Sequence, residues 1–237
     1  MKDTEEKLSS VDWERVTEEM NAKGYAIIPD VISNEQCEQL VNNYSSTAQY
    51  RKTITMEGYR FGSGEYKYFK YPLPDLLQSI REEVYFHLAP IANSWMKMLE
   101  MDKRFPDKFI ELQNLCHTKN QIHPTVLILK YNKGGFNTLH QDLYGEVFFP
   151  IQAVLFLNEP NEDYTGGEFV LIQQNPRAQS QAIVLRPPKG CMLIFTTSFR
   201  PVKGNKGYHR VNVKHGVSEL YDGQRHTLGI IFHDALS

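Results

Sequence analysis

His140 and Asp142 stand two residues apart in the sequence. They follow the turn-forming run Asn132-Lys133-Gly134-Gly135 and precede the apolar run 147–157. On a β-strand, side chains two residues apart point to the same face, so this imidazole and carboxylate converge, whereas on a helix they diverge. One His and one Asp are two corners of the 2-His-1-carboxylate site that holds Fe(II) and leaves positions open for a co-substrate and O₂. The pattern predicts a metal site in an extended segment, completed by one further histidine.

Four later histidines can supply the remaining ligand, namely His209, His215, His226 and His233. His226 stands next to Arg225 in the last predicted strand. His233, at the end of that strand, is followed by Asp234, which points to the opposite face. These two positions are therefore set aside, and His209 and His215 remain open.

Arg225 and Thr227 form a second feature with chemical meaning. They lie on one face of the predicted terminal strand, and a guanidinium beside a hydroxyl suits a carboxylate, because Arg offers a bidentate fork that Lys lacks. The pair predicts an anchor for a carboxylate-bearing small molecule.

These residues together resemble the 2-oxoglutarate/Fe(II)-dependent oxygenases. In that superfamily the second ligand histidine precedes the co-substrate arginine by about ten residues, and here His215 precedes Arg225 by ten. Tyr131 ahead of His140, the turn 166–169 and the strand 190–195 are also similar to members of the prolyl-hydroxylase type, so the likeness covers residues 125–233. More narrowly, residues 215–235, 64–69 and 71–74 resemble a group of prokaryotic oxygenases predicted to oxidise alkylated bases in nucleic acid.

The resemblance implies roles for individual residues. His140, Asp142 and His215 would be the catalytic Fe(II) ligands, and His209 is the alternative to His215. Arg225 and Thr227 would bind the far carboxylate of 2-oxoglutarate, Tyr131 would add a hydrogen bond, and O₂ would take the remaining iron position. Asn132, Gln141 and Gln152 are candidates for the pocket or for supporting the ligands, and the alternative for each is an ordinary polar residue whose hydrogen bonds are satisfied elsewhere.

The reaction implied is hydroxylation of a C–H bond, with oxidative demethylation of an alkylated nucleic-acid base as one form. Alternatives are a peptide or small-molecule hydroxylase, a metal-binding cupin-like sensor without turnover, and a zinc hydrolase, which would leave Arg225 unexplained. Ile231 stands where well-studied alkylated-base oxygenases carry a second arginine. The prime substrate therefore stays open.

The pattern of apolar residues predicts an α+β fold. Short β-branched and apolar runs after residue 122, punctuated by Gly and Pro, are typical of a double-stranded β-helix of the jelly-roll or cupin type, with the N-terminal helices packed on one sheet. We expect one domain, 1–237, mainly helical over 1–122 and forming the β-helix core over 123–237.

The N-terminal part offers several local predictions. Apolar spacing predicts a helix over 3–22 with Gly24 past its end, and Tyr25 to Pro29 reads as a strand. Ser33 and Gln36 form a capping box for a second helix. Two further helices are expected, one from Pro74 that Pro90 should kink or break, and one over 106–117 whose core face holds Phe109, Ile110, Leu112 and Leu115.

Two segments are predicted as loops that dock substrate at the mouth of the barrel. Residues 59–71 interleave aromatic and basic side chains, and residues 200–214 contain five basic and no acidic residues. Both patterns suit contacts with bases and phosphates, although a basic loop is often merely solvated.

Composition sets the remaining limits. The 237 residues carry a formal net charge of −2, so no global attraction to nucleic acid or anionic membrane is expected. No apolar run is long enough to span a bilayer, and the N-terminus lacks the apolar core of a signal peptide. Cys37, Cys116 and Cys191 lack disulfide or C-x-x-C spacing, so we expect buried thiols in a reducing, cytoplasmic setting. The oligomeric state stays open.

Overall fold

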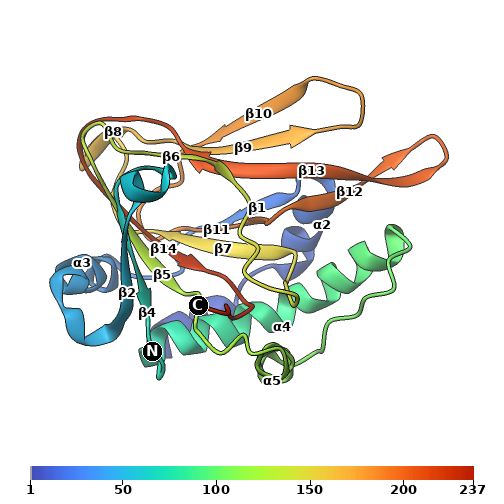
Figure 1. Cartoon of the computed structure of the whole chain (residues 1–237), viewed down its shortest axis with the longest axis horizontal. Helices are drawn as coiled ribbons and strands as arrows, with labels where there is room; N and C mark the ends of the chain where they lie inside the picture. The colour runs from blue at the N-terminus through green and yellow to red at the C-terminus, as the bar shows by residue number, and fades with distance from the viewer. Residues whose placement is uncertain (1) are drawn as a thin grey trace.

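Two antiparallel sheets face each other, and helices cover the outer face of the larger one (Figure 1). The structure is a computed structural model that describes residues 2–237. The eight-stranded sheet has the order β1 (Tyr25–Ile28), β11 (Met192–Thr196), β7 (Ile151–Phe156), β14 (Leu220–Ile230), β5 (Leu127–Asn132), β4 (Glu65–Phe69) and β2 (Tyr50–Thr55), with β8 (Tyr164–Gly166) beside β14. The six-stranded sheet has the order β10 (Ser180–Leu185), β9 (Phe169–Gln174), β13 (Gly207–Val217), β6 (Phe136–His140) and β3 (Gly62–Ser63), with β12 (Phe199–Gly204) beside β13.

The helices are α1 (Lys2–Ser9), α2 (Trp13–Lys23), α3 (Asn34–Asn42), α4 (Asp75–Met98) and α5 (Phe109–Thr118), with short 3₁₀ turns η1 (Asn43–Ser45), η2 (Thr47–Gln49) and η3 (Met56–Tyr59). Strand β7 packs against the helices on one face and against the smaller sheet on the other. Its side chains Ile151, Ala153 and Leu155 belong to the cluster formed with the helices, while Val154 and Phe156 pack between the two sheets. Burial on both faces accounts for the unbroken apolar run in the sequence.

The predicted helix over 3–22 is wrong in one respect, because two helices occupy this range. Asp12 caps the start of α2 by accepting a hydrogen bond from the Arg15 backbone N–H, which ends the first helix before it. Gly24 ends α2 in the left-handed conformation (φ 80°), as expected. The capping box of Ser33 and Gln36 at the start of α3 is also confirmed.

Of the kink or break expected at Pro90, the break does not occur, since α4 continues from Asp75 to Met98. Pro90 lies on the exposed face of the helix, where water can solvate the carbonyl group that proline leaves without an N–H partner. Helix α5 begins at Phe109 rather than at 106. Two of its predicted core residues are wrong, because Ile110 is 54% and Leu115 is 40% exposed.

Strands also form where the sequence predicted loops. Residues 50–69 form the pair β2 and β4 at the edge of the large sheet, and residues 199–217 form the hairpin of β12 and β13. Residues 1–122 are mainly helical, as predicted, but they also contribute the four strands β1 to β4. Existing sheet edges supply backbone partners that local composition does not reveal. Gly62, at φ 134°, lies where a Cβ would meet the Phe136 carbonyl oxygen, so this glycine serves close strand pairing.

The last residues of the chain are bound to α4 by a buried cation. The guanidinium of Arg81 donates to the carbonyl oxygens of Ile231 and Phe232 and to the Tyr71 hydroxyl, and it pairs with Asp234 at 2.8 Å. Arg81 is 0% and Asp234 is 1% exposed. Each charge is therefore compensated by the other and by polar neighbours.

Two smaller expectations concern cysteines and membrane spans. Cys37, Cys116 and Cys191 are buried, and all three are free thiols in the described structure. Among residues 2–237, no helix combines the length and the apolar character needed to cross a bilayer.

The Arg81–Asp234 pair predicts a large stability effect. Arg81→Leu leaves the Asp234 carboxylate buried without its cation and should lower the free energy of unfolding by about 3–5 kcal/mol. Arg15→Leu is the matched control, because the Arg15–Glu19 pair is solvent-exposed and should contribute less than about 1 kcal/mol. Urea unfolding followed by tryptophan fluorescence measures both variants. Equal losses would contradict the assignment of Asp234 as a buried, cation-dependent carboxylate.

Candidate metal and co-substrate site

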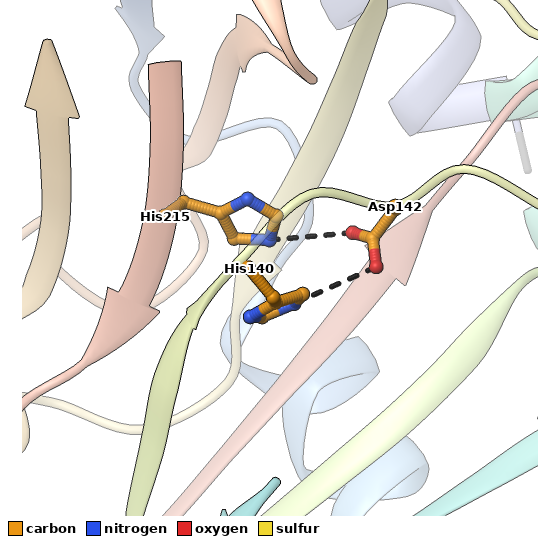
Figure 2. Close-up of side chains that lie close together, drawn as sticks. All are labelled: His140, Asp142 and His215. Atoms are coloured by element: carbon orange, nitrogen blue, oxygen red, sulfur yellow. Dashed lines mark ion pairs between the residues drawn. The ribbon is translucent and has the colours of Figure 1, made fainter. Parts of the chain in front are cut away.

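The His and Asp predicted as metal ligands converge with His215 (Figure 2). His140 ends β6, Asp142 follows just beyond the strand, and His215 lies directly opposite His140 in the pairing of β6 with β13. The Nε2 atoms of His140 and His215 lie 3.5 and 3.2 Å from the two carboxylate oxygens of Asp142. One potential ligand atom from each residue lies within 4.8 Å of the others, so the three can reach a common metal ion.

The imidazoles are oriented for coordination through Nε2. His140 Nδ1 lies 2.7 Å from the Thr138 carbonyl oxygen, and donation to this oxygen fixes the tautomer with a free Nε2. His215 is buried, and burial together with the nearby His140 lowers its pKa. The His215 ring is therefore neutral near pH 7, which is the form that binds a metal.

Asp142 is held by two neighbours. The Tyr144 hydroxyl donates to one carboxylate oxygen at 2.8 Å, and the Gln152 amide donates to the other at 2.9 Å. Burial by itself would raise the pKa of Asp142, but the imidazoles of His140 and His215 and the Tyr144 hydrogen bond outweigh it and hold the pKa well below its usual range. The carboxylate is ionised and oriented. Gln152 was predicted as a pocket residue, whereas Tyr144 was missed, although its position two residues after Asp142 was a usable signal.

A cavity of about 220 Å³ joins this cluster to the predicted co-substrate residues. Its walls include the three clustered residues together with Tyr131, Arg225 and Thr227. Gln141 also lines it, and its amide donates to the Ser198 and Val213 carbonyl oxygens. Asn132 is exposed and accepts a hydrogen bond from Gln224, so of its two predicted alternatives it is the satisfied polar residue and not part of this cavity.

Arg225 is the least compensated charge in the cavity. It is 1% exposed, and its Nε and Nη1 atoms have no hydrogen-bond partner among the described residues. The rings of Tyr131, Phe156 and Tyr164 surround its guanidinium, with centroids 5.5–5.9 Å away. A buried, unpaired guanidinium is costly unless an anion meets it, so this position fits a carboxylate ligand.

The other two co-substrate residues lie close to Arg225. Thr227 stands two residues further along β14 and is 3% exposed, and Tyr131 is directly opposite Arg225 on β5. The Tyr131 hydroxyl accepts a hydrogen bond from the Asn137 amide, and burial raises its pKa to about 12, so it remains a phenol. Both hydroxyls thus line the cavity as neutral hydrogen-bonding groups.

The other candidate histidines lie outside the cluster. His209 is near the tip of the β12–β13 hairpin, 3.5 Å from Asn175. His226 contacts Asn158, and His233 accepts a hydrogen bond from the Phe149 backbone N–H. Burial lowers the pKa of His226 to about 4 and that of His233 to about 3, so both are neutral structural residues.

The two predicted docking segments differ in the structure. Phe61 and Tyr66 line the cavity, but among the described residues none from 200–214 does. Arg200 is 8% exposed and donates to the Gln173 side chain, so it is not free for a phosphate group. The structure therefore supports only the first segment as part of the cavity.

The comparison with protein families agrees with this geometry. The family model Oxygenase-NA, described as "Oxygenase, catalysing oxidative methylation of damaged DNA", matches residues 64–235. The chain belongs to this family of oxygenases. It is also similar to an uncharacterised protein of Mycobacterium tuberculosis, found in strains CDC 1551 / Oshkosh and H37Rv, with 42% identity over 167 residues that cover 70% of this chain and 72% of the relative.

Solved structures share the fold. A prolyl-4-hydroxylase from Pseudomonas putida has a TM-score of 0.58 and 14% identity, covering 94% of this chain and 98% of the other. An oxidoreductase of the 2OG-Fe(II) oxygenase family from Burkholderia pseudomallei has a TM-score of 0.56 and 12% identity, covering 95% and 93%. The chain is therefore an oxygenase with the fold of 2-oxoglutarate/Fe(II) enzymes, and the predicted class is confirmed.

The cluster predicts which substitutions remove metal binding. Asp142→Ala or His215→Ala removes one of the three ligand groups. Loss of a residue that only hydrogen-bonds to a ligand weakens metal binding by up to about 100-fold, so loss of a ligand itself should weaken Fe(II) binding by more than about 100-fold. His209→Ala is the control and should bind Fe(II) like the unchanged protein. Anaerobic calorimetric titration measures all three. Loss of binding in His209→Ala with retention in His215→Ala would reverse the assignment of the third ligand.

Proposed function

We propose that this oxygenase uses Fe(II) and 2-oxoglutarate to hydroxylate an alkyl group on a nucleic-acid base and so removes it oxidatively. The observation that carries the proposal is the shared cavity: a His-Asp-His cluster lies in the same small space as a buried arginine whose Nε and Nη1 atoms have no hydrogen-bond partner among the described residues. The His-Asp-His cluster suits a metal ion, and the buried arginine suits a carboxylate group of a dicarboxylate. The family to which the chain belongs is described as oxygenases.

The strand order supports a more specific fold, the double-stranded β-helix, built as one domain over 1–237. Strands β5, β14, β7 and β11 are neighbours in one sheet, and β6, β13, β9 and β10 are neighbours in the other. Several consecutive strands thus alternate between facing sheets, as in a jelly roll. The helices share a hydrophobic cluster with the large sheet, which supports a single folding unit.

His140, Asp142 and His215 would hold the iron. When bound, Fe(II) supplies the activation of O₂ for C–H oxidation, coupled to decarboxylation of 2-oxoglutarate to succinate. The chain positions the ligands: the Thr138 carbonyl oxygen fixes the His140 ring, and Tyr144 and Gln152 fix the Asp142 carboxylate. Such outer contacts raise the precision of a metal site.

Arg225 would donate two hydrogen bonds to the far carboxylate of 2-oxoglutarate, and Thr227 would donate a third. Charge-assisted bonds of this kind are strong because the surrounding rings of Tyr131, Phe156 and Tyr164 keep water away. The Tyr131 hydroxyl lies in the same cavity and would contact the co-substrate as well.

The substrate is argued from the family and the chemistry. The family description names damaged DNA, and oxidation by O₂ acts on a methyl group by converting a C–H bond to C–OH. A hydroxymethyl group on nitrogen then leaves as formaldehyde, so the net result is removal of the methyl group. Phe61 and Tyr66 supply aromatic surface in the cavity for a base.

The co-substrate assignment predicts a strong effect at Arg225. Arg225→Ala removes the only buried cation in the described cavity wall and should raise the 2-oxoglutarate concentration required by about 100-fold or more. Arg225→Lys should also be impaired, because an ammonium group lacks the planar fork. Titration of 2-oxoglutarate into the Fe(II)-loaded proteins measures this. Unchanged dependence in Arg225→Ala would require another anchor.

The substrate proposal predicts substrate-dependent turnover. Single-stranded oligonucleotides with N-methylated bases should increase succinate formation and release formaldehyde, whereas unmethylated strands of the same sequence should not release it. Peptides and small molecules form the comparison set. Stimulation by a peptide alone would make the protein a peptide hydroxylase, and absence of succinate under every condition would indicate a binding or sensing protein.

A further inference from the structure

The turn between β2 and β3 lies beside β6 (Figure 1). It carries two exposed aromatic side chains. Tyr59, at the end of η3, is 56% exposed, and Phe61 is 45% exposed. The two rings are nearly parallel, at 16°, with centroids 5.5 Å apart. Large aromatic rings gain most from burial, so an exposed stacked pair indicates a contact surface for another molecule.

The backbone of this turn is held by contacts on its buried side. Met56 is 0% exposed and packs with Tyr131 in a small core cluster. The Glu57 carboxylate accepts hydrogen bonds from the Ser63 hydroxyl at 2.7 Å and the Gly64 N–H at 3.1 Å. The rings are therefore held without being covered, which lowers the entropy cost of binding a partner.

Phe61 connects the turn to the reactive cavity. Its ring lines the cavity, and its carbonyl oxygen accepts two hydrogen bonds from Thr138, one from the backbone N–H and one from the hydroxyl, both at 2.9 Å. Thr138 also lines the cavity and fixes the His140 ring. A group attached to the substrate just outside the cavity would therefore meet the rings of Tyr59 and Phe61.

Arg60 stands between the two rings in the sequence. It adopts the left-handed backbone conformation, with φ 59° and ψ 31°, which is uncommon for a residue with a side chain. Such backbone conformations cluster at binding and catalytic sites. Arg60 is exposed, and among the described residues it forms no ion pair, so its guanidinium is available to an anion.

We propose that Tyr59, Arg60 and Phe61 bind the nucleotide next to the base that enters the cavity, with its base stacked on the rings and its phosphate near Arg60. The inference rests on the proposed nucleic-acid substrate. Stacking on aromatic side chains tolerates every base, because each base has a π-face, and a guanidinium forms paired hydrogen bonds with phosphate. This site would hold a strand whose overall attraction to a chain of net charge −2 is weak.

The test uses two single-stranded pentanucleotides with a methylated central base. In the first pair, one strand carries the fluorescent base 2-aminopurine immediately on one side of the methylated base, and the other strand carries an abasic residue at the same position. A second pair places the 2-aminopurine or the abasic residue on the other side of the methylated base. For one of the two positions, the full-length protein should bind the intact strand roughly 5- to 150-fold more tightly than the abasic strand. Binding should also quench 2-aminopurine fluorescence through stacking.

Variants assign this difference to the turn. In the double variant Tyr59→Ala, Phe61→Ala, intact and abasic strands should bind equally, and the quenching should disappear. Tyr59→Phe keeps the ring and should retain both effects. Phe86→Ala removes a ring that is 59% exposed on α4, and it should change neither. Because these side chains are exposed, thermal melting should be nearly unchanged in all variants.

The outcomes separate this inference from the proposed function. If the unchanged protein binds methylated strands and the double variant still distinguishes intact from abasic strands, the turn is not the stacking site, although the nucleic-acid substrate stands. If the unchanged protein binds no strand while a peptide stimulates succinate formation, both the substrate and this site are overturned.

Discussion

The pairing of β6 with β13 is the constraint on which the site depends. It sets His140 opposite His215, with ring centroids 4.2 Å apart, and brings Asp142 to both rings just after the strand ends. Side chains alternate between the faces of a strand, so a shift of one residue in this register would turn one histidine out of the cavity. The position of the two histidines is thus set by the sheet, and the segment just after β6 adds Asp142 to the cluster.

Arg81 and Arg225 are both buried, but one stabilises the fold and the other is suited to binding an anion. Arg81 is satisfied by Asp234 and by backbone carbonyl oxygens, and it binds the end of the chain to α4. Arg225 has an aromatic enclosure and free N–H groups directed at no protein carboxylate in the described chain. The first arrangement is complete within the protein and serves the fold. The second is complementary to an external anion, which is why it points to a binding role.

The sequence allowed prediction of those parts that follow a short repeat or spacing. The strand period predicted that His140 and Asp142 converge, although Asp142 lies just beyond the end of β6. The resemblance to 2-oxoglutarate oxygenases, through the interval from His215 to Arg225, selected the other residues that meet in the cavity. Local rules also predicted the caps at Ser33 and Gly24. Most strands of the C-terminal half were found, because apolar β-branched runs mark buried strands.

The remainder depends on contacts between distant segments. Gln152 acquires its relation to Asp142 only when β7 lies against the site. The basic segment 200–214 was predicted as a loop, yet it forms a hairpin whose strand β13 pairs with β9. The alternation of Val211 and Val213 with polar residues was a usable signal for this strand. Pro90 is tolerated because it faces solvent, a fact that the tertiary packing of α4 decides.

Strand β7 has a consequence for how this protein can vary over evolutionary time. Every residue of β7 is buried. Alternate side chains pack against the helices on one face and face the space between the two sheets, which contains the cavity, on the other. A polar replacement there would harm either folding or the site, so little drift is tolerated. Most of β10, by contrast, is exposed, and it lies at the edge of the smaller sheet. Lineages of this protein should therefore diverge first along that edge, where new side chains can change solubility or contacts without disturbing the reaction.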